Sequence, residues 1–418
     1  MRLPFLIILF ICLTCISKSN TPLSIFELDT IHEVRMHFKQ IKYWDTLISK
    51  YEQFHDSDVF GQDLILADVI IDGVTLDSIG VKLKSNFSFS IPGDKKPMKI
   101  DFNEFVKGRL FQGLRSLNLS NEFPDPSMLR NTIAYKIFRD AGLHAPRTSF
   151  ARLFINDKYR GLYILIEQVD KSFIAKHFEH QGGELIKPLA SSLAILPGDT
   201  MSFIKNFEIK SKNNAESWSR LIQLAKKINT TEPEIFFDSL NAYFDFDSYL
   251  PVFAGDIIFN NWDSYFYGQN YYLYRDPTEN KYYYLAWDYN VSMNNYNVSG
   301  GDFPILPGGS NSHLFRLPLP SKVIANPILK EKYLSEICRI NKYMSLDSLS
   351  AFIYKMHDMI RPAMKEDQGK IMTMDQFEKS LTNKFSISEM EFEGLLTFIR
   401  YRHEQINKLL EIEGRKCR

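Results

Sequence analysis

Hydrophobic and polar residues follow strand-like patterns through the first half of the chain. The run 65–71 is rich in Val and Ile and ends at Asp72-Gly73, a dipeptide typical of tight turns. In 81–84, apolar and charged residues alternate with the period of two that a half-buried strand requires. We therefore predict a mostly antiparallel sheet that carries one helix, with strands at 65–71, 81–84, 98–102, 150–155 and 163–168 and the helix at 125–141.

The period changes after Gly182-Gly183. Apolar residues then recur every three or four positions, which is the spacing of amphipathic helices. Two Tyr-rich runs, 271–274 and 282–286, interrupt this pattern and predict a hairpin. The predicted helices of this half lie at 218–228, 232–244 and 247–260 and over most of the chain from 322 onward.

These elements predict an α+β fold with two lobes, a small antiparallel-sheet lobe and a larger helical lobe. A strand-like start followed by a helix is expected over 24–54, ahead of the sheet. The predicted boundaries are a signal peptide at 1–19, an N-terminal extension at 20–64, the small lobe at 65–180 and the large lobe at 181–418.

The N-terminus has the pattern of an export signal. Arg2 is followed by an almost uniformly apolar run, 3–13, which is too short to span a bilayer. We therefore predict an extracytoplasmic protein, secreted or at the cell surface. Cys15 is a candidate for lipid modification, which would hold the mature protein peripherally on a membrane. Residues 12–14 match a lipoprotein signal poorly, so both forms of processing stay open.

Composition narrows the partners of the protein. Its 50 Lys and Arg residues are balanced by 50 Asp and Glu residues, which argues against nucleic acid as a partner. Beyond the predicted signal, the remaining cysteines are Cys338 and Cys417. They either pair in an oxidising compartment or stay as a buried Cys338 and a loose Cys417. The sequence does not indicate an oligomeric state.

Three polar residues flank the Tyr-rich hairpin. Asp263 lies in a loop after a predicted helix, Asn270 opens the first strand, and Asp288 follows the second. This order suits phosphoryl transfer, in which one carboxylate orients the attacking hydroxyl while an amide oxygen and a second carboxylate bind Mg²⁺. The alternative is that each of the three is an ordinary turn or cap residue.

The segments around this trio resemble the spore coat protein H (CotH) kinase family. The similar segments are Asn261-Trp262-Asp263, Asn270-Tyr271-Tyr272-Leu273-Tyr274 and Trp287-Asp288, and, upstream and in the same order, 81–89, 95–102, 117–134 and 155–167. The resemblance implies a secreted or surface protein with an atypical protein-kinase fold. It also implies an enzyme that transfers the γ-phosphate of ATP to Ser or Thr of a protein substrate, with Mg²⁺ or Mn²⁺.

The resemblance implies a role for each member of the trio. Asp263 would be the catalytic residue, and Asn270 and Asp288 would bind the metal. Two other functions stay open. One is a non-catalytic cell-surface or coat protein that serves binding or adhesion on the same fold, and the other is a nucleotidyl transferase.

The ATP-binding residues that the resemblance implies lie upstream. Lys96 or Lys99 would contact the phosphates, and Glu167 would lie near the adenine or pair with that lysine. The loop after 84 departs from the family pattern, because Ser85 replaces a Gly that lets backbone amides approach phosphate closely. The cofactor-binding residues expected in this loop are Lys84, Ser85, Asn86 and Ser88.

Overall fold

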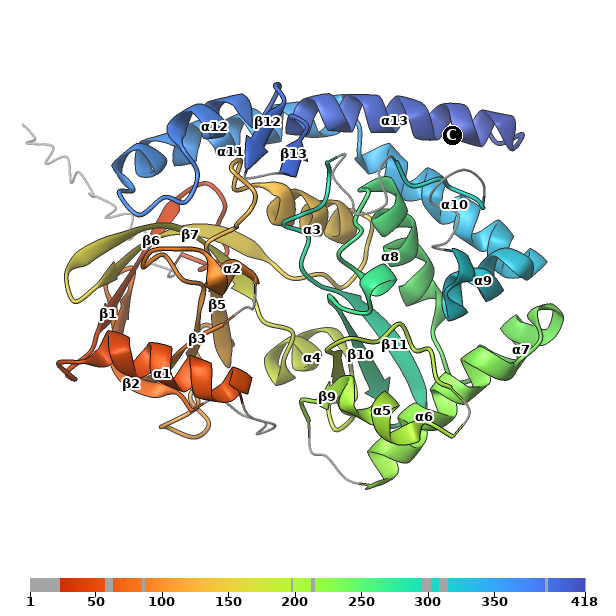
Figure 1. The fold of residues 1–418 in the computed structure, drawn as a ribbon, viewed down its shortest axis with the longest axis horizontal. Helices are drawn as coiled ribbons and strands as arrows, with labels where there is room; N and C mark the ends of the chain where they lie inside the picture. Colours follow the sequence, from red (N-terminus) through yellow and green to blue (C-terminus); the bar gives the residue numbers. More distant parts are fainter. Residues whose placement is uncertain are drawn as a thin grey trace, which may run out of the picture.

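The computed structural model describes residues 23–56, 63–84, 87–196, 198–211, 215–294, 302–307, 315–387 and 390–417. The predicted signal peptide with Cys15, and the loop residues Ser85 and Asn86, lie outside the described residues. Figure 1 shows a barrel of strands at one side of the molecule and, at the other side, a part that combines helices with a second sheet.

Seven strands close into a barrel in the order β1-β2-β3-β4-β5-β7-β6. Neighbouring strands are antiparallel, except that β1 runs parallel to β6. Side chains alternate between the two faces, so that Val81 and Leu83 of β3 fill the barrel. The strands are β1 (Ile31–His37), β2 (Ile65–Ile71), β3 (Val74–Leu83), β4 (Met98–Asp101), β5 (Ser116–Ser120), β6 (Thr148–Ile155) and β7 (Lys158–Glu167).

The barrel corrects the predicted start of the sheet domain. Strand β1 lies within 20–64, which we predict as an extension, yet it pairs with both β2 and β6. An open sheet would leave both of these edge strands without partners, and β1 satisfies their backbone groups by closing the barrel. Helix α1 (Tyr43–Asp56) follows β1 and packs on β2 and β3, as the strand-then-helix pattern predicts.

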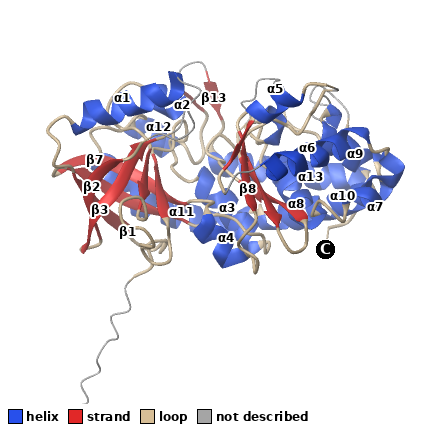
Figure 2. Cartoon of the chain, turned by 90° about the horizontal axis from the view of Figure 1, so that it is seen from below, coloured by secondary structure: helices blue, strands red, loops and turns tan. Residues whose placement is uncertain are grey.

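A four-stranded sheet in the order β11-β10-β8-β9 lies in the second part of the molecule, apart from the barrel (Figure 2). Strands β10 (Tyr271–Asp276) and β11 (Lys281–Ala286) confirm the predicted hairpin. The prediction of a helical second half missed the other strands, which are too short to show a clear period. The missed strands are β8 (Glu184–Pro188), β9 (Phe207–Ile209), β12 (Phe385–Ile387) and β13 (Met390–Phe392).

Helices surround this second sheet and connect it to the barrel. None of those in the described part of the chain is long and apolar enough to cross a membrane. Their bounds are α2 (Phe87–Ser90), α3 (Arg130–Asp140), α4 (Lys171–His177), α5 (Thr200–Lys205), α6 (Ala215–Thr230), η1 (Pro233–Ile235), α7 (Phe236–Leu240), α8 (Phe246–Ile258), η2 (Tyr265–Tyr267), α9 (Pro318–Ala325), α10 (Pro327–Tyr343), α11 (Leu346–Glu366), α12 (Met374–Lys379) and α13 (Leu395–Ile412).

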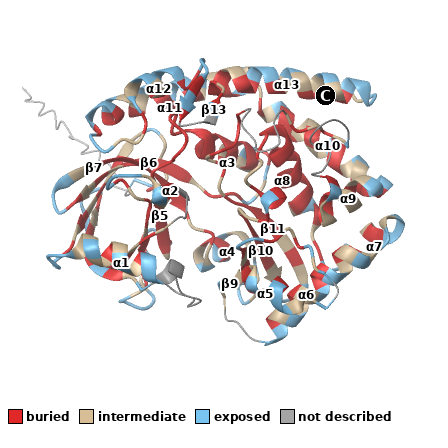
Figure 3. Cartoon of the chain, in the orientation of Figure 1, coloured by how far each residue is buried: buried red, intermediate tan, exposed pale blue. Residues whose placement is uncertain are grey.

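The molecule has two hydrophobic cores, and strand β7 contributes to both. Tyr163 and Leu165 point into the barrel, whereas Ile164 and Ile166 belong to the larger core around α3 and α8. Figure 3 shows this larger core as a continuous buried region across α3, α8 and the second sheet. Part of the outer face of the barrel, along β6 and β7, is therefore covered by the second part, and the end of β7 lies where the two meet.

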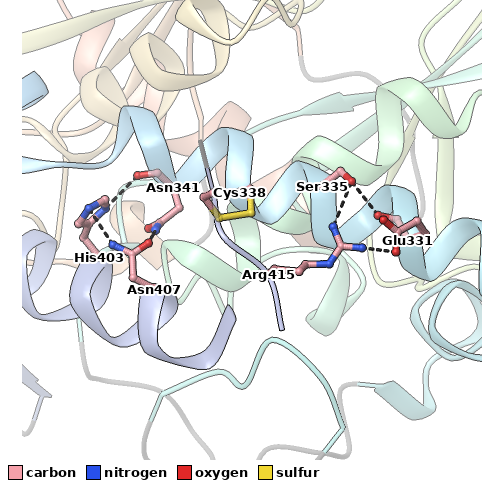
Figure 4. The surroundings of a disulfide bond; sticks show 8 residues. Glu331, Ser335, Cys338, Asn341, His403, Asn407 and Arg415 are labelled. Carbon is pink, nitrogen blue, oxygen red and sulfur yellow. Dashed lines mark hydrogen bonds and ion pairs between the residues drawn. A yellow bond between two sulfur atoms is a disulfide. The ribbon is translucent and has the colours of Figure 1, made fainter. Parts of the chain in front are cut away.

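A disulfide ties the end of the chain to helix α10. Cys338 and Cys417 are bonded, with their Cα atoms 5.3 Å apart, which settles the two alternatives left open by the sequence. Figure 4 shows the bond between the contacts of α10 with α13 and with Arg415. Arg415 pairs with Glu331, and His403 contacts the carbonyl of Asn341 at 3.0 Å. The C-terminal segment is thereby held along α10.

Candidate functional site

Asp263 and Asn270 lie side by side in the loop between α8 and β10. The Asn270 Nδ2 donates to the Asp263 carboxylate at 3.0 Å and to its backbone carbonyl at 2.7 Å. Gln269 donates to the other carboxylate oxygen. Asn270 has a φ of 57°, a left-handed conformation that Asn tolerates well, and this turns the chain into β10. The loop therefore fixes the orientation of the Asp263 side chain.

Asp288 reaches the same place from the other strand of the hairpin. Tyr271 pairs with Ala286, so Asn270 and Trp287 emerge at one end of the β10–β11 pair. Burial and the negative charge of Asp288 raise the pKa of Asp263 to about 6, in keeping with the place of Asp288 at the same end of the hairpin. The structure thus brings together the three residues that the sequence singles out.

A buried network that the sequence did not reveal holds the Asp288 segment. Asn131, in the first turn of α3, accepts from the backbone N–H of Tyr289 at 2.7 Å. Its Nδ2 contacts both carboxyl oxygens of Glu122 at 3.1 Å. The Tyr135 hydroxyl accepts from the Asp288 N–H at 2.8 Å. These residues come into contact only when the chain folds. In the sequence, they could be found only through the segment that resembles the first helix of the family.

Glu122 is fully buried close to Asp288. Burial, with the charges of Asp125 and Asp288, raises the pKa of Glu122 to about 8. Its carboxyl group is therefore protonated at neutral pH, and the region avoids one more buried negative charge. The charge left to attract a cation is that of Asp263 and Asp288.

Three lysines lie on the outer face of the barrel, and one of them, Lys84, reaches the same region. Lys82 and Lys84 alternate with the core residues of β3, and Lys99 of β4 pairs directly with Lys82. The Lys84 Nζ donates to Asn118 Oδ1 at 2.9 Å and lies 5.5 Å from the centre of the Trp287 ring. Since Trp287 precedes Asp288, Lys84 faces the carboxylate site of the second part, whereas the carboxylate that most opposes the lowered pKa of Lys99 is Asp170.

These amines are crowded and poorly hydrated. Burial and the charge of Lys187 lower the pKa of Lys84 to about 7, although Asp288 opposes the shift. Burial and the charge of Lys99 likewise lower the pKa of Lys82 to about 8. Burial also lowers the pKa of Lys99. An excess of positive charge that is removed from water attracts an anion with several charges, such as a chain of phosphates.

The structure separates Lys96 from Lys99. The Lys96 amine donates to the carbonyl of Phe89 at 2.6 Å and to that of Ile91, and so it holds the turn after α2. Lys99, in contrast, lies with Lys82 on the barrel face. Ser88 donates to the Phe123 carbonyl at 3.3 Å, which also gives it a structural partner.

Glu167 ends strand β7 and pairs with Arg147. The Arg147 Nε and Nη2 donate to its two carboxyl oxygens at 2.9 and 2.6 Å, and Lys176 lies at 3.7 Å. Burial alone would raise the pKa of Glu167, but Arg147 and Lys176 outweigh it and lower that pKa. The expected pairing with a phosphate-binding lysine is therefore replaced by a pair with Arg147, at the junction of the two parts.

The trio suits a divalent cation by its chemistry. Asp263, Asn270 and Asp288 supply oxygen ligands of the kind that Mg²⁺ and Mn²⁺ take. Burial and the charge of Asp288 raise the pKa of Asp263, and a cation bound at Asp288 would offset that charge. Within the described ranges, no three His, Cys, Asp or Glu side chains form a metal-binding group.

Asp256→Asn should lose less folding free energy than wild type as the pH rises. Burial raises the pKa of Asp256 to about 7, whereas an unfolded aspartate titrates near about 4. The folded state then binds the proton more tightly, so this residue lowers stability as the pH rises from about 4 to about 7. Asn keeps an oxygen for Tyr289 at 2.9 Å and Asn261 at 3.0 Å. The gain over wild type at pH 8, relative to pH 4, is roughly 2–4 kcal/mol.

Urea unfolding of both proteins between pH 4 and pH 8 measures this difference. Asp247→Asn is the matched control, since Asp247 lies in the same helix with a side chain that is 79% exposed. Equal pH slopes for wild type and Asp256→Asn would contradict a protonated Asp256.

Fold and site together define an α+β protein in which a lysine-bearing barrel faces a carboxylate-bearing hairpin. The family described as CotH kinase protein matches residues 85–406. The chain therefore belongs to the CotH kinase protein family.

Relatives occur in a bacterium and a fungus. The inner spore coat protein H of Bacillus subtilis is 23% identical over 284 residues, which cover 66% of this chain and 76% of that protein. Invasin CotH3 of Rhizopus delemar is 26% identical over 354 residues, 76% of this chain and 56% of that protein. Spore coat protein homolog 1 of the same fungus is 27% identical over 59% of this chain and 41% of its own length. The chain thus spans about half the length of these fungal relatives.

Two solved structures give loose overlays. The Helicobacter pylori proinflammatory kinase CtkA overlays at a TM-score of 0.28 and 10% identity, over 71% of this chain and 92% of that chain. The Shewanella oneidensis HipA, HipB and operator DNA complex gives a TM-score of 0.31 at 12% identity, over 71% of this chain and 57% of that chain. Overlays this loose add nothing to the assignment.

Proposed function

We propose that the protein is an exported, two-lobed atypical protein kinase of CotH type. It transfers the γ-phosphate of ATP to Ser or Thr of a protein substrate with Mg²⁺ or Mn²⁺. The observation that carries this proposal is the meeting of two charge groups across the barrel and the hairpin. Lys84 and Lys99 supply positive charge from the barrel, while Asp263 and Asp288 supply negative charge from the second part.

Each residue has a role in this proposal. Bound ATP would supply the phosphoryl group, and the cation would offset its negative charge. Asp288 and the Asn270 oxygen hold the cation, and Lys84 and Lys99 hold the phosphate oxygens. Asp263 orients the acceptor hydroxyl and accepts its proton as the new O–P bond forms and the bond to the β-phosphate oxygen breaks. With a pKa of about 6, Asp263 is mostly ionised at neutral pH and able to take that proton.

Export is the second part of the proposal. The apolar run at 3–13 motivates it, and relatives named as spore coat proteins and invasins support a coat or cell-surface location. A mature protein that begins after residue 19 and is found outside the cytosol is the expected result. An intact Met1 on a cytosolic protein would contradict export.

A non-catalytic surface protein is the second candidate, because relatives of this chain are named invasins. The two candidates differ in what they do with ATP. The mature protein is incubated with γ-labelled or α-labelled ATP, a mixture of candidate acceptor proteins and either Mg²⁺ or Mn²⁺. We expect protein-bound label from γ-labelled ATP alone. Label from the α position would indicate nucleotidyl transfer, and no label from either would favour the binding protein.

A further inference from the structure

Lys187 is a lysine of the second sheet whose charge acts on Lys84 of the barrel. It lies in β8, one residue after Ile186, which pairs with Leu273 of β10, so Lys187 shares a sheet face with Tyr272. The centres of the Tyr272 and Trp287 rings lie 5.6 Å apart. The Lys84 amine lies beside the same Trp287 ring. Lys187 and Lys84 therefore approach one region from different sheets.

The amine of Lys187 has no fixed partner in the part of the chain that the structure describes. It makes no hydrogen bond and no ion pair there, and the same holds for Lys99 of the barrel. Glu208 lies across from Lys187 in β9, but the ion pair of Glu208 is with Lys210, at 2.5 Å. A structural lysine at the edge of a core would be expected to have a carboxylate or carbonyl partner.

Electrostatics point to an anionic partner. Burial and the charge of Lys210 lower the pKa of Lys187, while Glu208 and Asp288 only partly oppose this. Lys187 is in turn the charge that most lowers the pKa of Lys84. Amines from two sheets thus repel one another. A polyphosphate between them would replace this repulsion by charge-assisted hydrogen bonds.

We propose that Lys187 is a phosphate-binding residue that holds the nucleotide from the sheet side of the site, opposite Lys84 and Lys99. This inference rests on the proposed ATP-dependent function and adds a residue to it. Lysines from both parts of the molecule would then bind the phosphates, so that nucleotide binding depends on the barrel and the second sheet together. Lys187 lies in a short strand between apolar residues, where no pattern in the sequence distinguishes it.

Calorimetric titration of the mature full chain with ATP, adenosine and inorganic tripolyphosphate, in the presence of Mg²⁺, tests the proposal. Lys187→Gln should weaken ATP binding about 10–100-fold, as expected for a lost charge-assisted bond, and leave adenosine binding within about threefold. Lys187→Arg should restore most of the affinity, which a merely structural role would not predict. Lys158→Gln is the control, because it removes one exposed charge at the far turn of β7.

The outcomes separate this proposal from the proposed function. Wild-type affinity for ATP in Lys187→Gln would overturn the role of Lys187 and leave the kinase proposal intact. If wild type binds tripolyphosphate but not ATP, and Lys187→Gln loses the tripolyphosphate, the residue binds phosphate and the kinase proposal fails. If wild type binds neither, both fail.

Discussion

Asp288→Ala is expected to abolish metal-dependent binding of ATP. Asp288 is the negative charge that opposes the lowered pKa of Lys84, and its carboxylate and the Asn270 amide are the oxygens proposed to hold the cation. Without it, the cation has one carboxylate fewer and the phosphates meet the remaining carboxylate without shielding. We expect ATP affinity in Mg²⁺ to fall at least about 100-fold, measured by calorimetry. The pKa of Asp263 should also fall, since the charge of Asp288 helps to raise it.

Asp263→Asn is expected to have the opposite effect, because it should keep ATP binding and lose phosphate transfer. It keeps the shape of the side chain beside Asn270, so ATP and metal should bind within a few fold of wild type. Phosphate transfer should fall by about 10²–10⁴-fold, because the group that orients and deprotonates the acceptor is lost. A KM for ATP near that of wild type with a low kcat is the expected signature.

Asp276→Asn is the matched control for both variants. Asp276 lies at the other end of strand β10, where its carboxylate accepts from the backbone of Thr278 and Glu279 at 2.8 and 3.0 Å. Asn keeps an acceptor for these bonds, and we expect binding and transfer to stay at wild-type levels. Transfer at the wild-type rate by Asp263→Asn, or tight metal-dependent ATP binding by Asp288→Ala, would remove the assigned roles.

Arg130→Met is expected to cost about 3–5 kcal/mol of folding free energy. Arg130 and Asp125 form an ion pair at 2.6 Å in which both side chains are 0% exposed. Removing the guanidinium leaves the Asp125 charge buried without its cation. It also removes the donor to the Ser292 carbonyl at 2.9 Å and to that of Glu393 at 3.1 Å. The loop that follows Asp288 would thereby lose its anchor on α3.

Urea unfolding of the mature protein measures this loss. Lys136→Met is the control, because Lys136 lies on the same helix and pairs with Asp140 at the surface, where such a pair contributes about 0–1 kcal/mol. A loss below about 1 kcal/mol for Arg130→Met would contradict the account of this pair as the anchor of the segment.

The sequence predicted individual strands and helices better than it predicted that the strands close into a barrel. The Val- and Ile-rich run before Asp72-Gly73 identified β2, alternation identified β4, and the two Tyr-rich runs identified the β10–β11 hairpin. It could not show that β1 joins β6 in parallel, since 110 residues or more separate the paired positions and neither strand records its partner. The short β8 was missed for a different reason, as five residues are too few to show a period.

For the candidate site, too, the sequence predicted some residues and missed others. The order of Asp263, Asn270 and Asp288 along the chain identified them because a hairpin brings its two ends together. Glu122 and Asn131 contribute through contacts across more than 150 residues of sequence, as the bond between Asn131 and Tyr289 shows. Lys96 and Lys99 are three positions apart, and only strand pairing reveals that Lys99 lies on the face with Lys82.

We propose that the carboxylates of the hairpin and the lysines of the barrel form one metal–nucleotide site. The most direct test of this proposal is a crystal structure with Mn²⁺ and a non-hydrolysable ATP analogue, in which the anomalous signal of manganese locates the metal. We expect a manganese peak bound by Asp288 and Asn270, with the phosphates between it and Lys84 and Lys99. Manganese or nucleotide bound elsewhere, with this region free of both, would contradict it.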